Sequence, residues 1–191
     1  MKKIILFFGF HITLLVASSI YATPIATVTE NDYLITGTTA SELRAQMKQL
    51  GPGDNGGHYD AYTKYYVKWR YGLEEENDQC HLANIQVTIQ TSFTFPRWKN
   101  YADATPAMQS KWDQYLTNLK HHEQGHADNG MDAANEIENM LSALPAMDRC
   151  DALRQEADSK AYGILSSYQQ KDVNYDEETH HGETQGVVLG D

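Results

Sequence analysis

The chain has 191 residues, with 26 acidic and 15 basic side chains and a formal net charge of −11 at pH 7. Such an acidic chain lacks the positive surface that contacts with phosphate groups require, so nucleic-acid binding is disfavoured. Its length is that of one domain with a sizeable hydrophobic core.

Residues 1–22 have the composition of a secretory signal peptide. Two lysines precede an apolar run, and small residues follow it up to Ala22, after which we expect cleavage. Residues 23–191 would then form a single domain in the periplasm or outside the cell, with 13 basic and 26 acidic residues and a net charge of −13. An uncleaved anchor is the alternative, but Ile4–Ile20 is short for a membrane span, so we expect no stable membrane insertion.

Early in the predicted domain, the pattern indicates a strand, a helix and a loop. Residues 29–37 have the composition of a short strand entering a turn. Residues 41–50 place Leu43 and Met47 at helical spacing, and the glycine-rich residues 51–60 predict a loop.

Two segments of alternating polar and apolar residues follow, over 61–71 and 82–95. The second is the clearer one, and its predicted inward side chains are Ile85, Val87, Ile89, Phe93 and Phe95. The acidic turn EEENDQ separates the two segments, so we expect a long antiparallel hairpin.

Two helices are predicted after the hairpin. A Thr-Pro pair starts the first, which runs over residues 106 to about 142 and ends before Pro145. An Asp-Asn-Gly run within it favours a kinked continuation, because the apolar stripe stays in phase beyond the glycine. The second helix is predicted over residues 148–169. The predicted class is α+β, with an antiparallel sheet packed on the long helix and on a C-terminal helix.

The chain has two cysteines, Cys80 and Cys150, and both lie in the part predicted to be exported. An oxidising compartment lets them pair, so we predict a disulfide. Closing so long a loop contributes about 4 kcal/mol to stability in the chain-entropy model. A cysteine metal site is the alternative, and it is disfavoured because the only histidine or cysteine close to either is the adjacent His81.

The motif HEQGH lies at residues 122–126, on the apolar stripe of the long helix. His122 and His126 are four residues apart, so both rings can reach one zinc ion. Glu123 is placed to hold a water on the metal and take its proton, as in zinc hydrolases. A chance match is the alternative, but unpaired polar groups are costly on a buried face.

The ordered set of motifs resembles a bacterial family of predicted secreted zinc-dependent proteases that carries an unknown-function label. The resemblance covers most of the predicted mature chain through DYLITG, the GPG loop, KYYVKWRY, Cys80 and its following strand, FPRW, HEQGH, Cys150 and NYDEETHHGETQG. It implies a zincin-like fold, a sheet packed on the active-site helix, and hydrolysis of peptide or protein substrates.

A catalytic zinc site needs a third protein ligand and an open position. The segment YDEETHHG resembles the family's Tyr-Asp pair followed by threonine, any residue, histidine and glycine, which assigns the third ligand to His181. Tyr175 is a candidate donor to an oxyanion. The alternatives for the third ligand are His180, Asp132 and Glu156, and a further alternative is that the tail is only an acidic, partly disordered end.

Two functions from different classes are therefore open. The first is a secreted or periplasmic zinc peptidase, and the second is a non-enzymatic zinc-binding or protein-interaction protein of the cell envelope. Glu123 separates them, because a zinc-binding protein has no use for a general base. For a peptidase, the outer side of residues 84–94 is expected to serve as the strand that pairs with an extended substrate.

Overall fold

The computed structural model describes residues 23–53 and 58–190, so the predicted signal peptide lies outside the described residues. Within these ranges the elements follow in the order β1 (Ile25–Ile35), α1 (Ala40–Leu50), β2 (Tyr62–Glu76), β3 (Gln79–Trp98), η1 (Tyr101–Asp103), α2 (Pro106–Ala143), α3 (Cys150–Thr179) and η2 (Glu183–Gln185). The mixed α+β class is as predicted.

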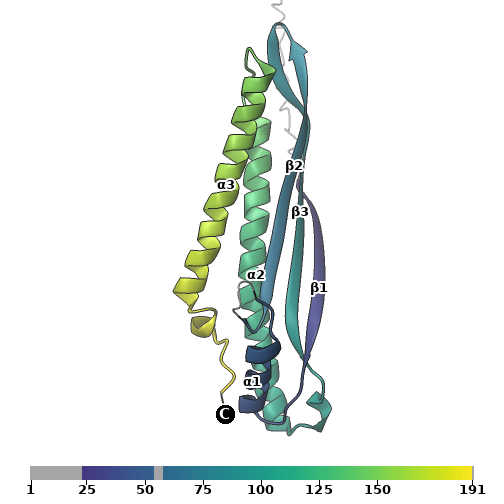
Figure 1. Ribbon diagram of the computed structural model, residues 1–191, viewed down its shortest axis with the longest axis vertical. Helices are drawn as coiled ribbons and strands as arrows, with labels where there is room; N and C mark the ends of the chain where they lie inside the picture. Colours follow the sequence, from purple (N-terminus) through teal and green to yellow (C-terminus); the bar gives the residue numbers. More distant parts are fainter. Residues whose placement is uncertain (1–22, 54–57, 191) are drawn as a thin grey trace, which may run out of the picture.

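The molecule is elongated, and its sheet, α2 and α3 run along the long axis (Figure 1). α2 packs against β2 and β3 as well as against α3, and α3 also contacts the sheet. No helix within residues 23–53 or 58–190 is both long and apolar enough to cross a membrane.

The sheet has the strand order β1-β3-β2. β2 and β3 form the predicted antiparallel hairpin, but β1 lies parallel to β3, from Ile25 opposite Thr88 to Ile35 opposite Trp98. The prediction of a wholly antiparallel sheet was therefore wrong. A parallel neighbour needs a long connection, and α1 with its flanking loops supplies one between β1 and the hairpin.

Residues 84–94 belong to β3, the central strand, and residues 88–94 have β1 on one side and β2 on the other. The prediction that these residues form the strand that pairs with a substrate was also wrong. In the described sheet, the edge strands are β1 and β2, and β3 has an unpaired side only before Thr88 and after Thr94.

Alternation in the hairpin produces two buried clusters against the helices. Val87, Ile89, Phe93 and Phe95 are buried as predicted. The first cluster joins the sheet to α1 and the start of α2, and includes Ile35, Leu43, Met47, Phe93, Phe95, Trp98, Trp112, Tyr115 and Leu119. The second joins the sheet to the later part of α2 and to α3, and includes Val67, Val87, Ile89, Ala134, Ile137, Leu141, Ala157 and Ala161. Residues 122–126 lie on α2 between Leu119 and Ala127, which both belong to the first cluster.

α2 is one unbroken helix of 38 residues, within a residue of the predicted bounds. Thr105 caps its first turn by accepting a hydrogen bond from the backbone N–H of Met108, and Pro106 occupies the first helical position. Gly130 does not end the helix. A Cβ atom there would lie 2.6 Å from the ring of Tyr65, so glycine lets β2 approach α2 closely.

α3 continues to Thr179, ten residues beyond the predicted end at 169. It ends where His180 and His181 take left-handed backbone conformations, with φ of 51° and 53°. The segment that contains Tyr175 and Asp176 is therefore helical and lies beside α2.

The predicted disulfide between Cys80 and Cys150 is confirmed. It joins the start of β3 to the first residue of α3. Backbone hydrogen bonds between Cys80 and Met147 lie beside it, with N···O distances of 2.7 and 3.0 Å. The far end of the hairpin is thus attached covalently to α3 and by main-chain pairing to the segment that precedes α3.

Candidate metal centre

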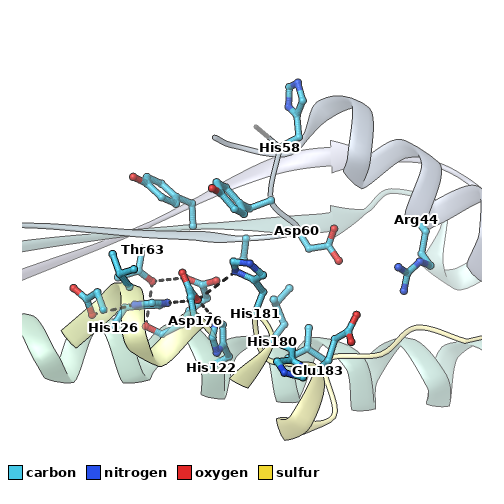
Figure 2. A pocket seen from close by; sticks show the side chains of 18 residues that line it. Arg44, His58, Asp60, Thr63, His122, His126, Asp176, His180, His181 and Glu183 are labelled. Atoms are coloured by element: carbon cyan, nitrogen blue, oxygen red, sulfur yellow. Dashed lines mark hydrogen bonds and ion pairs between the residues drawn. The ribbon is translucent and has the colours of Figure 1, made fainter. Parts of the chain in front are cut away.

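The HEQGH motif faces the last turns of α3 (Figure 2). His122 and Glu123 are 3% and 5% exposed, which confirms that the motif lies on the buried side of α2. Burial of these polar groups is costly unless each finds a partner, so their contacts define the site.

Both imidazoles point one nitrogen at the same carboxylate oxygen. The Nε2 atoms of His122 and His126 each lie 3.2 Å from Oδ1 of Asp176. One potential ligand atom from each of these three residues lies within 4.8 Å of the others, so the group could hold a metal ion.

The other nitrogen of each imidazole is held by an oxygen. His122 Nδ1 lies 2.9 Å from Oε1 of Gln185, and His126 Nδ1 lies 3.1 Å from Oδ1 of Asp172. Both oxygens accept hydrogen bonds, so each Nδ1 must carry a proton. In a neutral ring, Nε2 then presents a lone pair toward Asp176, which is itself an acceptor. Such converging acceptors need a proton or a metal ion between them, and the residues therefore fit a metal ion.

Asp172 is in turn fixed by two donors. Its Oδ2 accepts a hydrogen bond from the hydroxyl of Tyr65 at 2.6 Å, and its Oδ1 accepts one from Nδ2 of Asn129 at 2.8 Å. Tyr65 belongs to β2, Asn129 to α2 and Asp172 itself to α3, so the orientation of His126 depends on all three elements. This pattern of a carboxylate behind a histidine is common around protein metal sites.

Without a metal, the neighbouring carboxylates favour the protonated form of His126. Burial alone lowers the pKa of His126, but hydrogen bonds to Asp172 and Asp176 raise it to about 10. Burial raises the pKa of Asp176, and hydrogen bonds from His122 and His126 outweigh this effect and hold it well below its usual range. The ionised carboxylate of Asp176 thus attracts a positive charge at this point, whether a proton on His126 or a bound cation.

Glu123 is oriented by the first residues of β2. Thr63 Oγ1 lies 2.6 Å from Oε2 of Glu123 and 3.1 Å from its main-chain oxygen. Burial raises the pKa of Glu123, while the Thr63 hydrogen bond and the two nearby histidines act in the opposite direction. The net result is a raised pKa, which makes the ionised carboxylate a stronger base than an exposed glutamate.

Tyr175 packs against the motif rather than into open space. Its ring stacks on that of His122, with centroids 5.0 Å apart and an interplanar angle of 11°. Its hydroxyl lies 3.3 Å from the main-chain oxygen of His122 and accepts a hydrogen bond from Nε2 of Gln185 at 2.9 Å. A Cβ at Gly125 would overlap this hydroxyl, which explains the glycine in HEQGH. The oxyanion role of Tyr175 stays a prediction.

His181 lies beside the group formed by His122, His126 and Asp176, but it is more exposed to solvent than they are. Its Nδ1 is 3.6 Å from Oδ1 of Asp176, and its side chain is 66% exposed. The predicted alternatives Asp132 and Glu156 lie elsewhere, in exposed ion pairs with Lys171 and Lys160. Asp176 and His181 are thus the residues that the structure brings to the two motif histidines.

A family model described as "Bacterial protein of unknown function (DUF922)" matches residues 30–182. The chain belongs to the DUF922 family. Neither the search of curated proteins nor the search of solved structures found a match. The range shared with DUF922 includes the HEQGH motif, Asp176 and His181, whereas Gln185 lies beyond it. The family description assigns no activity, so protease and zinc chemistry belong to the proposal below.

The cluster opens into a cavity of about 540 Å³. α1, β2, α2 and α3 all contribute to its wall, together with the segments before β2 and after α3. Figure 2 shows Thr63, His126 and Asp176 toward one end and Arg44 at the other. A substrate in this cavity would reach Glu123 and the three converging ligand atoms together.

Asp172, Asp176 and Gln185 were missed from the sequence. The two aspartates are four residues apart, as are the two motif histidines, so a helix that continued past residue 169 would have placed both carboxylates on one face. Gln185 has no local signal, because only the fold brings it to His122.

Proposed function

We propose that this DUF922 protein is a secreted or periplasmic zinc-dependent peptidase. In this proposal His122, His126 and Asp176 hold the ion, and Glu123 is the general base. The disulfide fits an oxidising compartment. The observation that carries the proposal is the pair of oxygen acceptors behind the two imidazoles, because they turn both Nε2 lone pairs toward one carboxylate.

Zinc bound in such sites makes water more acidic and polarises a carbonyl group. Glu123 would take a proton from the attacking water on its carboxylate and deliver it to the leaving amine. Thr63 holds Oε2 of Glu123 during this transfer, and Tyr175 keeps the ring of His122 in place. β2 is an edge strand whose residues Tyr62 and Thr63 line the cavity, so an extended peptide is expected to run beside it.

The alternative is a protein that binds zinc without catalysis. Glu123 argues against it, because it is not among the converging ligand atoms. A buried carboxyl with a raised pKa weakens the fold, and a binding protein gains nothing from this cost. A general base, by contrast, benefits from a raised pKa.

The Glu123→Gln variant tests the proposal. It keeps the size of the side chain and should retain zinc, while cleavage of a protein or peptide library should fall by about two to four orders of magnitude, because the base is lost. The His126→Ala variant should lose zinc and activity together. Cleavage would be followed by mass spectrometry, with zinc content measured on the same samples.

The matched control is Glu178→Gln, the same change at an exposed position of α3. It should leave cleavage and zinc content unchanged. If Glu123→Gln cleaves as well as the unmodified protein at equal zinc occupancy, the peptidase mechanism is wrong and the zinc-binding alternative replaces it.

A further inference from the structure

Arg44 is the one arginine or lysine among the described residues that line the cavity. It extends from α1 toward the cavity, at the opposite end from His126 (Figure 2). Its helix is well fixed, because Leu43 and Met47 are fully buried and Thr39 and Glu42 form a capping box at its start. The cation is therefore presented from a rigid element.

Within the described parts of the chain, Arg44 makes no hydrogen bond or ion pair. Two other arginines have acidic partners, Arg97 with Asp32 and Arg149 with Asp151. The carboxylate of Asp60, which also lines the cavity, accepts a hydrogen bond from the hydroxyl of Tyr115 at 2.6 Å. The guanidinium is thus available to a ligand.

We infer that Arg44 binds a carboxylate of the substrate, at a subsite separate from the metal centre. This inference rests on the proposed function. A guanidinium can bind a carboxylate through two parallel hydrogen bonds, which gives both affinity and orientation. Asp60 and Glu183 line the same cavity, so a group with one negative charge fits better than a phosphate, which carries more.

A peptide has two sources of such a group, namely its C-terminal carboxylate and the side chain of an aspartate or glutamate. The first source would make the protein act near the C-terminus of its substrate. The second would make it select an acidic residue at a fixed distance from the cleaved bond. Both use the same contact with Arg44, so peptides of matched design distinguish them.

The experiment measures binding to the zinc-loaded Glu123→Gln variant of residues 23–191, which should bind substrates without cleaving them. The probes are N-acetylated pentapeptide pools of uncharged residues, prepared as free acids or as amides, and amide pools with one glutamate or one glutamine at each position. The fraction of each pool retained on immobilised protein is measured by mass spectrometry. Zinc content is recorded for every sample.

We expect a carboxylate from at least one source to increase retention on the order of tenfold, as for a hydrogen-bonded charge pair. Adding Arg44→Gln should reduce the ratio of carboxylate to neutral pools to about one, and Arg44→Lys should give an intermediate ratio. Lys48→Gln is the matched control, because it removes the same charge from the same helix at a residue outside the cavity lining. It should leave the ratio unchanged.

Equal retention of all pools, no retention of any pool, or a preference that survives Arg44→Gln would overturn the inference. Its failure is distinguishable from that of the proposed function. If the unmodified protein cleaves peptides without a preference for carboxylates, the inference alone fails. If carboxylate peptides bind through Arg44 but none is cleaved, the peptidase proposal alone fails.

Discussion

The two motif histidines depend on residues distant in the chain. His126 is held by Asp172 from α3, and His122 by Gln185, 63 residues away. Each acceptor turns a flexible ring into a directed ligand. The motif in α2 therefore supplies nitrogen atoms, while their direction comes from the C-terminal part of the chain.

Asp172→Asn should lower zinc affinity about 10- to 100-fold, the usual cost of removing a partner of a metal-bound histidine. The amide has one acceptor atom, and Tyr65 and Asn129 both donate to this side chain, so His126 loses its carboxylate partner. Chelator competition measures the affinity. Asp158→Asn is the control, because Asp158 lies on the same helix as Asp172, accepts hydrogen bonds from Trp69 and Tyr71 of β2, and is not in the cavity lining. If Asp172→Asn and Asp158→Asn reduce zinc affinity equally, Asp172 has no specific role in holding His126.

Asp176→Ala should reduce zinc affinity by more than about 100-fold, because it removes one of three converging ligand atoms. His181→Ala should have the smaller effect, since His181 is largely exposed. Asp132→Ala, in an exposed ion pair, is the control. The reverse order, with zinc lost on changing His181 and kept on changing Asp176, would restore the ligand set predicted from the motif pattern.

At the scale of elements, periodicity predicted the hairpin and the long helix because both bury one regular face. The end of α3 was misjudged because residues 170–179 are polar and acidic and carry no apolar stripe. What holds that segment in place is its hydrogen bonds to the motif, through Asp172 and Asp176, and only the folded chain brings these groups together. The parallel placement of β1 likewise follows from tertiary contacts rather than from its own pattern.

In the candidate site too, only the residues that share one helix could be predicted from their spacing. Spacing within one helix was enough to predict His122, Glu123 and His126 as a group. Thr63, Asp172 and Gln185 come from three other places, and nothing local marks any of them. Residues of such ordinary type become recognisable only when distances across the fold are known.

Reduction of the Cys80–Cys150 disulfide should lower the free energy of unfolding by about 4 kcal/mol, because the closed loop spans 70 residues. Zinc affinity should change little at 25 °C. Twenty-six residues of α3 separate Cys150 from Asp176, which is about 40 Å of helix. Denaturant unfolding with and without reductant measures the first quantity, and chelator competition measures the second. A loss of zinc on reduction would show that the two ends are coupled.

At the scale of the whole molecule, the candidate metal ligands His122, His126 and Asp176 would join α2 to the far end of α3. Zinc at 100 times its dissociation constant should stabilise the folded protein by about 2.7 kcal/mol. This corresponds to a rise in Tm of roughly 5–10 °C for a domain of this size. Calorimetry with zinc and with a chelator measures the shift. The Glu123→Gln variant should show the same rise in Tm, and the Asp176→Ala variant should show none. If zinc does not change the Tm of the unmodified protein, the proposed zinc site is wrong.

The residues of the candidate metal site are synthesised at different times, because they lie far apart in the chain. A ribosome completes α2 at residue 143, yet Asp172, Asp176 and Gln185 are made much later. Until then the motif histidines lack both the carboxylate of Asp176 and the oxygens that direct their rings, so the proposed metal site should form only when nearly the whole chain has been made. If residues 1–22 direct export as predicted, we expect the proposed metal to bind after translocation, from the pool outside the cytoplasm.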